Sequence, residues 1–218
     1  MKKSFVVIGI GRFGLSVAET LESLGADVLA IDQNNDAVSK AIETVSQCII
    51  CDSTNAESLK KLSIKNIDHA IVAIGSNIQA TILTTIALKE LGVKKVTVRV
   101  DDMHFSSVIK KLGADEVISP ELLAGEQLAN RVISDNFIDH YNISDEYAVI
   151  KVKINGDYKA TKLREMNLRS EFNINIAMIT RNGKTFMPDA DSMIVANDDI
   201  LIIGKKSDIN RFDRSINK

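Results

Sequence analysis

The sequence has almost no excess of either charge, and this excludes one large class of functions. Its 27 basic and 29 acidic side chains leave a formal net charge of −2. A protein that binds nucleic acid usually carries a basic excess, so we expect no nucleic-acid partner. The sequence also lacks any run of about 18 apolar residues, so no segment is predicted to span a membrane. We therefore expect a cytoplasmic protein.

Cysteine and histidine are too scarce and too scattered to predict a metal or redox centre. Cys48 and Cys51 form a C-x-x-C, a spacing found in redox and zinc sites. They lie in a predicted strand, where positions three apart face opposite sides of the sheet, and zinc would need two more ligands nearby. We therefore interpret both as small buried hydrophobic residues. The three histidines receive no function.

The most informative segment is a glycine-rich turn that follows the first apolar run. Residues 5–14 read FVVIGIGRFG. Gly9 permits a tight turn, Gly11 lets backbone N–H groups approach phosphate, and Gly14 lets a helix lie close to the strand. The start of that helix offers N–H groups and a partial positive charge to an anion. The spacing predicts a nucleotide-binding turn, and the alternative is a turn required only for packing.

An acid at the end of the next apolar run supports the nucleotide interpretation. Asp32 follows the turn by roughly the 20 residues at which such an acid binds ribose hydroxyls. An acid at this position favours an unmodified ribose over a 2′-phosphate, which makes NAD or NADH one candidate ligand. Alternatively, Asp32 caps the helix that begins near Asn35.

The order of apolar runs and helical patterns predicts an α/β fold. Continuous apolar runs are typical of parallel strands that are covered on both faces. The predicted element is a six-stranded, doubly wound, Rossmann-like parallel sheet. Its strands are expected at 4–9, 27–32, 47–51, 68–74, 95–100 and 115–118. Its helices are expected at 12–24, 35–44, 55–62, 77–91 and 104–112. The 77–91 helix has few charges, so we expect it to be buried nearly all round.

The pattern changes toward the C-terminus, where a second domain is predicted. A helix over 121–136 follows Pro120 and leads away from the sheet. Strands are expected at 147–154, 174–180 and 200–204, with a hairpin turn at 181–184 and a short helix at 207–215. These elements predict a small α+β C-terminal domain. We place the nucleotide-binding domain at 1–136 and the C-terminal domain at 137–218.

Four short motifs then make the chain resemble a known family. They are GRFG at 11–14, AIGSNIQA at 73–80, GAD at 113–115 and SPE at 119–121. The chain is similar over its whole length to the cytosolic RCK (TrkA-N/TrkA-C) regulatory subunits of bacterial Ktr potassium uptake systems. The resemblance implies no enzymatic activity. It implies a homodimer that assembles into an octameric ring under a membrane potassium-translocating subunit, at the inner face of the membrane, and gates it by exchange of ATP and ADP.

The resemblance also assigns residues near the phosphates and the base. Arg12, followed by Phe13, matches a loop arginine that faces the terminal phosphate of ATP across the dimer interface. A guanidinium fork suits phosphate oxygens, and the alternative is a solvated Arg on the first helical turn. Asp52 matches a position near the adenine base, or it caps the helix near Asn55.

Three further positions lie at or beyond strand ends. Asn77 follows the fourth strand at the topological switch point where ligands bind, and its alternative role is a helix cap. Arg99 matches a basic residue that approaches the phosphates, or it forms a salt bridge at the sheet edge. Glu121 matches an acid that assists a Mg²⁺ or Ca²⁺ ion, which would also need phosphate oxygens or water. The alternative for Glu121 is an acid favoured in the first turn of a helix.

The C-terminal domain partly matches a pattern by which some family members bind cyclic di-AMP. The matching positions are Leu163, Asn167, Arg169, Asn175 and Ile176. Asn167 stands where the pattern usually has Asp. Arg169 is expected to contact phosphate and Asn175 the polar groups near it. The alternative is a surface arginine and a turn asparagine.

Two other functions stay open at this stage. The first is an NAD-dependent dehydrogenase with a small second domain, and the second is a nucleotide-binding regulator of another membrane protein. A dehydrogenase needs an acid/base group beside the nicotinamide, and the last 80 or so residues offer no clear cluster of that kind. The regulatory function is therefore favoured.

Overall fold

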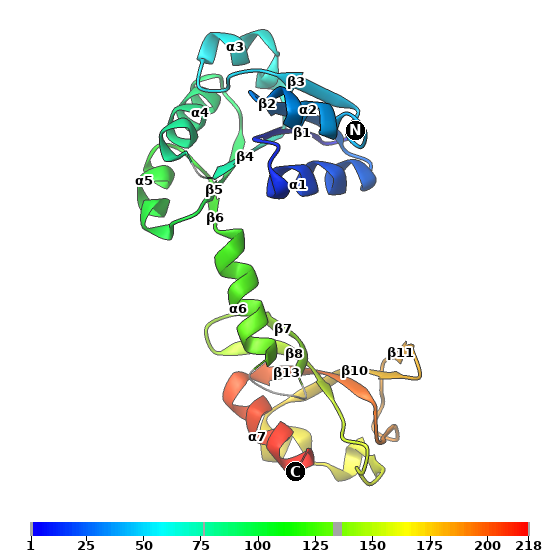
Figure 1. The fold of residues 1–218 in the computed structure, drawn as a ribbon. Helices are drawn as coiled ribbons and strands as arrows, with labels where there is room; N and C mark the ends of the chain where they lie inside the picture. The colour runs from blue at the N-terminus through cyan, green and yellow to red at the C-terminus, as the bar shows by residue number, and fades with distance from the viewer. Residues whose placement is uncertain (1, 76, 133–136, 218) are drawn as a thin grey trace. The chain divides into compact units, whose positions relative to one another are not determined.

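The computed structural model describes residues 2–75, 77–132 and 137–217, and the chain forms two compact units (Figure 1). The first unit ends at Leu122 and the second begins at Leu123. The predicted domain boundary between residues 136 and 137 adjoins residues 133–136, which lie outside the described residues. That boundary therefore stays a prediction.

Six parallel strands form the sheet of the first unit, as predicted (Figure 1). Their order is β3-β2-β1-β4-β5-β6. Strands β2 and β3 lie on one side of β1 and strands β4 to β6 on the other, so the strand order switches between β1 and β4. This is the doubly wound, Rossmann-like arrangement. The strands are β1 (Ser4–Ile8), β2 (Asp27–Asp32), β3 (Gln47–Ile50), β4 (His69–Gly75), β5 (Lys95–Val100) and β6 (Glu116–Ile118).

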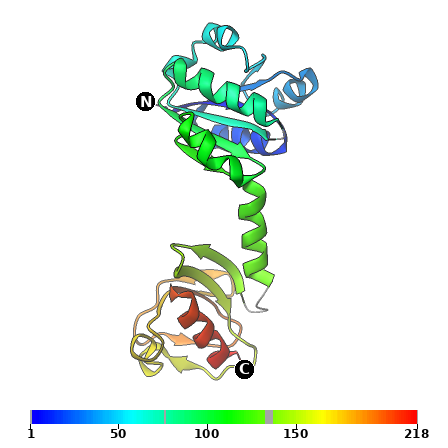
Figure 2. The same cartoon turned by 90° about the vertical axis from the view of Figure 1, so that its left-hand side faces the viewer.

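Helices cover both faces of this sheet (Figure 2). The helices are α1 (Arg12–Ser23), α2 (Asn35–Ala41), α3 (Ala56–Lys61), α4 (Ile78–Glu90) and α5 (Ser106–Lys111), with short turns η1 (Ile64–Asn66) and η2 (Met103–Phe105). Along β1, Val6 and Ile8 face the core shared with α3, α4 and α5, whereas Val7 faces the core shared with α1 and α2. Because both faces are buried, the strand is apolar at successive positions.

Helix α4 buries threonines as well as apolar side chains. Thr81, Thr84 and Thr85 are fully buried, and each hydroxyl has a partner. Thr81 donates to the carbonyl of Asn77 at 3.0 Å, and Thr85 donates to the carbonyl of Thr81 at 2.7 Å. The Thr84 hydroxyl lies 2.9 Å from the hydroxyl of Ser53. These bonds remove the cost of burying the hydroxyls, and the last one ties the segment after β3 to α4.

The second unit contains an antiparallel sheet. Its strand order is β11-β10-β13-β8-β7, and a separate pair joins β12 to β9. The strands are β7 (Phe137–Asn142), β8 (Tyr147–Lys153), β9 (Thr161–Lys162), β10 (Asn175–Arg181), β11 (Lys184–Phe186), β12 (Met193–Ile194) and β13 (Asp199–Lys205). The helical segments are α6 (Pro120–Val132), which begins in the first unit, η3 (Leu163–Glu165), η4 (Leu168–Phe172) and α7 (Lys206–Ile216). The predicted strands, hairpin and last helix are present. Strands β7, β9 and β12 were not predicted. The helix predicted over 121–136 is present as α6, and residues 133–136 of that prediction lie outside the described residues.

One face of this sheet packs on α7. Ala148, Ile150 and Val152 alternate along β8 and are buried with Ile209 and Phe212 of α7. The residues between them are half-buried or exposed, as the alternation in the sequence predicts for a strand with one covered face. Among the described residues, no helix is both long and apolar enough to cross a membrane.

A buried ion pair fixes the hairpin end of the second unit. The Asp198 side chain is 1% exposed and accepts bonds from Arg181 Nε and Nη2, both at 2.8 Å. Asp198 also accepts the backbone N–H of Val195 at 2.9 Å, and Arg181 donates to the carbonyl of Met193 at 2.7 Å. The pair thus ties β10 to β12 and to the turn before β13.

We predict that Asp198→Ala lowers the free energy of unfolding of the second unit by about 3 kcal/mol, because it leaves Arg181 and the Val195 N–H without their acceptor. Urea denaturation followed by circular dichroism measures this change. The control is Asp191→Ala, whose side chain is 62% exposed, and it should change stability by less than about 0.5 kcal/mol. Equal effects of the two variants would contradict the structural role of the buried pair.

Candidate functional site

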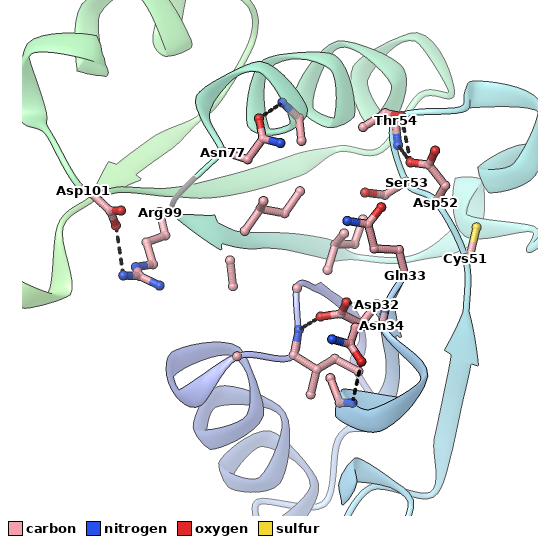
Figure 3. Close-up of a pocket in the computed structure, with 18 residues that line it drawn as sticks. Asp32, Gln33, Asn34, Cys51, Asp52, Ser53, Thr54, Asn77, Arg99 and Asp101 are labelled. Atoms are coloured by element: carbon pink, nitrogen blue, oxygen red, sulfur yellow. Dashed lines mark hydrogen bonds and ion pairs between the residues drawn. The ribbon is translucent and has the colours of Figure 1, made fainter. Parts of the chain in front are cut away.

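A cleft of about 590 Å³ lies at the carboxyl ends of strands β1 to β5 (Figure 3). This is the side of an open α/β sheet on which ligands bind. Six of the predicted site residues line it, namely Gly9, Gly11, Asp32, Asp52, Asn77 and Arg99. The other lining residues are Ile8, Ile10, Gln33, Asn34, Ala37, Cys51, Ser53, Thr54, Ala73, Ile74, Ala80 and Asp101.

The glycine turn requires glycine on steric grounds at Gly9 and Gly14 but not at Gly11. Gly9 has φ +93°, a left-handed conformation that disfavours other residues. A Cβ on Gly14 would lie 1.9 Å from the carbonyl oxygen of Gly9, so only glycine allows α1 to lie this close to the turn. A Cβ on Gly11 would meet no atom within 4 Å. The backbone of Gly11 therefore borders open space in the cleft.

The N-terminus of α1 faces this turn without a side-chain cap. Gly11 occupies the N-cap position and has no side-chain oxygen to accept the first N–H groups. By contrast, α2, α3 and α4 each begin after an asparagine whose side chain accepts such N–H groups. The uncapped N–H groups and the helix dipole of α1 give the cleft a place that suits an anion.

Asp32 stabilises the glycine turn. Its Oδ2 accepts the backbone N–H of Ile10 at 2.6 Å, and its Oδ1 accepts that of Asn34 at 2.9 Å. The helix cap proposed as the alternative for Asp32 is instead Asn34, which accepts the N–H groups of Asp36 and Ala37. Asp32 therefore holds the turn in place and also lines the cleft.

Asp52 lies at the same end of the cleft as Asp32 (Figure 3). Its Oδ1 accepts the hydroxyl of Thr54 at 2.7 Å and the backbone N–H of Thr54 at 2.9 Å. These hydrogen bonds, the hydroxyl first, lower the pKa of Asp52 below its ordinary value. The cap of α3 is Asn55 rather than Asp52, since Asn55 accepts from Glu57 and Ser58. The carboxylate thus stays charged and borders the cleft.

Asn77 combines both of the roles considered for it. Its side chain accepts the backbone N–H of Ala80 at 3.0 Å and caps α4, and it also lines the cleft.

Arg99 lies at the opposite end of the cleft from Asp52 (Figure 3). Its Nη2 donates to Asp101 at 2.9 Å and to Glu121, in the first turn of α6, at 2.7 Å. Its guanidinium carbon is 5.8 Å from the centre of the Phe13 ring, within reach of a cation–π contact. Glu121 does not line the cleft, but Arg99 connects it to the cleft.

Arg12 does not line the cleft of its own chain. It is exposed as the first residue of α1, and its side chain forms no ion pair or hydrogen bond within the described residues. Its charge is therefore available to a group outside this cleft.

Of the cleft residues that were not predicted from the sequence, five carry an amide, hydroxyl or carboxylate side chain: Gln33, Asn34, Ser53, Thr54 and Asp101. Each lies within a few residues of the end of β2, β3 or β5. Their position just beyond predicted strand ends was the signal that could have found them, because these ends meet at one edge of the sheet.

A second hollow, of about 500 Å³, lies in the second unit and brings together the five positions of the cyclic di-AMP pattern. Arg169 Nε donates to Asn175 Oδ1 at 3.1 Å, and Ile176 lines the same hollow. Asn167 has φ +49°, a left-handed conformation that asparagine tolerates better than most residues. The hollow is also lined by Arg164, Leu168, Ser170, Pro188, Asp189 and Ala190.

The two cysteine side chains pack on opposite faces of the sheet. Cys48 packs against the core on the α1 and α2 side of the sheet, whereas Cys51 packs against the core on the other side. Partial burial, and then the charge of Glu22 for Cys48 and Asp52 for Cys51, raise both thiol pKa values. Within the described ranges, no group of three His, Cys, Asp or Glu side chains is placed to hold a metal ion.

Two family models match the chain, the TrkA-N domain over residues 5–120 and the TrkA-C domain over residues 148–217. The chain is 38% identical over 217 residues to Ktr system potassium uptake protein C of Bacillus subtilis (strain 168), which covers 99% of this chain and 98% of that protein. It is 34% identical over 212 residues to Ktr system potassium uptake protein A of the same strain, covering 97% and 96%.

Among solved structures, the GsuK channel matches 99% of this chain with a TM-score of 0.72 and 15% sequence identity. The chain spans about two fifths of that protein, since the match covers 40% of it. At this identity the likeness bears on the fold alone.

We predict that Gly14→Ala destabilises the first unit by about 1–3 kcal/mol, because the added Cβ must displace α1 from the backbone of Gly9. The matched control is Gly125→Ala, another glycine inside a helix, where a Cβ meets nothing within 4 Å. Gly125→Ala should leave the free energy of unfolding unchanged or raise it, since alanine has a higher helix propensity than glycine. Thermal unfolding measures both changes. An unchanged melting temperature for Gly14→Ala would contradict the steric requirement.

Proposed function

The chain belongs to the family that joins a TrkA-N domain to a TrkA-C domain and includes the Ktr system potassium uptake proteins. On that premise we propose that it is a nucleotide-sensing regulatory subunit of a bacterial Ktr-type potassium uptake system. Its first unit binds ATP or ADP, and the bound nucleotide determines the activity of a membrane potassium-translocating subunit.

The observation that carries this proposal is the arrangement of charge along the cleft. The uncapped N-terminus of α1 and Arg99 offer donors suited to phosphates. Asp32 and Asp52, at the other end, offer acceptors suited to ribose hydroxyls and the amino group of a base (Figure 3). A volume of about 590 Å³ is in the range of small-molecule sites. An adenine nucleotide fits this distribution of donors and acceptors.

Arg12 supports a role for a second copy of the chain. Its exposed guanidinium has no partner among the described residues, and a fork of this kind holds phosphate oxygens well. We propose that Arg12 reaches the terminal phosphate of ATP bound in the neighbouring subunit of a homodimer. ADP lacks that phosphate, so the two nucleotides bind different dimer geometries with different affinities. Such a difference is what lets a ligand shift a conformational equilibrium.

The assembly follows from the same proposal. Homodimers form an octameric ring that docks on the membrane subunit, which places this chain at the cytoplasmic face of the membrane through its partner.

A Mg²⁺ or Ca²⁺ ion at Glu121 would need oxygen ligands from the phosphates and water, because one carboxylate is too few. The side chain of Glu121 is 62% exposed and can turn toward such an ion.

We favour regulation over hydride transfer for a chemical reason. The described residues that line the cleft include no histidine, lysine or tyrosine to act as a general acid or base. Their carboxylates at Asp32, Asp52 and Asp101 already accept hydrogen bonds or pair with Arg99. Reduction of NAD by any small alcohol or hydroxy acid in the presence of the protein would overturn this choice.

We also propose that the hollow of the second unit binds cyclic di-AMP. Arg169 is oriented by Asn175 through Nε and is otherwise exposed, so its remaining donors are open to a phosphate. Ile176 and Leu168 offer apolar surface to a base in the same hollow.

We predict that calorimetric titration will show tighter binding of ATP than of ADP, and that Arg12→Ala will remove most of this preference. ADP affinity should stay within about twofold, because ADP has no terminal phosphate for Arg12 to hold. Arg214→Ala, which removes an exposed arginine of α7, is the control and should retain the preference. An unchanged ATP preference in Arg12→Ala would reject the role of Arg12. Binding of NADH, with no binding of ATP or ADP, would reject the proposed ligand.

We predict that Arg169→Ala weakens cyclic di-AMP binding by at least about tenfold, since it removes charge-assisted hydrogen bonds to phosphate. ATP affinity in the same variant should be unchanged, because Arg169 lies in the other unit. Arg214→Ala again serves as the control. Equal cyclic di-AMP affinity in Arg169→Ala and the parent protein would remove the second-unit site.

A further inference from the structure

Arg99 is held by two carboxylates through a single nitrogen. Its Nη2 donates to Asp101 Oδ1 at 2.9 Å and to Glu121 Oε1 at 2.7 Å (the Asp101 contact is drawn in Figure 3). Of these two acids, Asp101 lines the cleft and Glu121 does not. An anion that enters the cleft and binds Nη2 must therefore displace Asp101 first.

In the part of the chain that the structure describes, the hydrogen bonds of Arg99 all come from Nη2, and its other donors contribute little to holding it. Within the described residues, its Nε is buried and has no hydrogen-bond partner. A buried N–H without an acceptor opposes the arrangement that leaves it so. The guanidinium also rests against the backbone of Gly75, where a Cβ would lie 2.7 Å from Nη1. Arg99 is thus held in this position chiefly by its two ion pairs.

The local charge also opposes an incoming phosphate. One guanidinium and the two carboxylates that it contacts carry a net charge of −1 together, and one of these carboxylates, Asp101, lines the cleft. Charges of the same sign within a few ångströms repel each other, more strongly near a protein surface than in bulk water. A phosphate oxygen that approaches Nη2 therefore competes with Asp101 for its N–H groups and is also repelled by the Asp101 carboxylate.

We propose that Asp101 sets the affinity of the cleft for nucleotide by competing with phosphate for Arg99. This inference rests on the proposed nucleotide-binding function and adds a residue to it. A neutral side chain at position 101 leaves Arg99 paired with Glu121 alone and easier for phosphate to capture. The wild-type protein consequently binds nucleotide more weakly than its glycine turn and Arg99 allow. The competition involves the phosphate groups, so the affinity for a ligand without phosphates does not depend on Asp101.

The test compares two neighbouring acids that differ in their contact with Arg99. Asp101→Asn removes the competing charge. The matched control is Asp102→Asn, because the Asp102 carboxylate accepts from the backbone N–H of His104 at 2.9 Å, lies 2.6 Å from His104 Nδ1 and does not contact Arg99. Both variants remove one negative charge at adjacent positions. ADP, ATP and adenosine are titrated into each protein by calorimetry, and thermal unfolding verifies that each is folded.

We expect Asp101→Asn to tighten ADP and ATP binding by about threefold to fivefold, the upper part of the range for a partly exposed ion pair, and to leave adenosine affinity unchanged. Asp102→Asn should stay within about twofold of the wild type. The gain should shrink as salt is raised, because salt screens exposed charges. Asp101→Ala should tighten ADP and ATP binding at least as much as Asp101→Asn. Asparagine still offers Arg99 a hydrogen-bond acceptor that competes with phosphate, and alanine offers none.

Three results would overturn the inference. An equal gain in Asp101→Asn and Asp102→Asn would indicate an effect of net charge alone. Weaker nucleotide binding in Asp101→Asn would indicate that Asp101 positions Arg99 for the ligand rather than competing with it. Unchanged binding would indicate that phosphate does not reach Arg99. If neither the wild type nor any variant binds ADP or ATP, the proposed nucleotide function itself fails.

Discussion

The close approach of α1 to the turn after β1 is the constraint on which the rest of the first unit depends. A Cβ on Gly14 would lie 1.9 Å from the carbonyl oxygen of Gly9, so helix and turn can be this close only because residue 14 is glycine. The approach aims the uncapped N-terminus of α1 into the cleft, and Asp32 secures it by accepting the Ile10 N–H. The proposed phosphate site, the proposed ribose acid and the tight turn are therefore parts of one packing arrangement.

The sequence was sufficient for the fold because its local signals agreed with one another. Continuous apolar runs indicated buried parallel strands, and the structure confirms the predicted sheet, with Val6, Val7 and Ile8 facing opposite cores. Alternation in residues 147–154 likewise indicated a strand with one covered face. Strand β7 was missed because its sequence has neither alternation nor a long apolar run, and it is defined by pairing with β8.

The site was less predictable because it depends on contacts between distant segments. The glycines and Asp32 have a fixed spacing, so a motif could find them. Asp101 could not be found in this way, because its importance comes from sharing Arg99 with Glu121, a residue on another element. For Asn77 the sequence offered a ligand-site residue and a helix cap as alternatives, and the structure gives it both a cap bond and a place in the cleft lining, since both follow from its position after β4. The proposed signalling role adds a requirement that no single chain meets, namely that Arg12 acts outside its own cleft, which it does not line.

A crystal structure of the protein bound to ATP tests the proposed nucleotide site most directly. We expect the phosphates at the N-terminus of α1, the ribose at Asp32, and Arg99 Nη2 turned from Asp101 toward a phosphate oxygen. We also expect that Arg12 of a second copy contacts the terminal phosphate. A structure with the nucleotide elsewhere, or with the phosphates away from the glycine turn, would contradict the account.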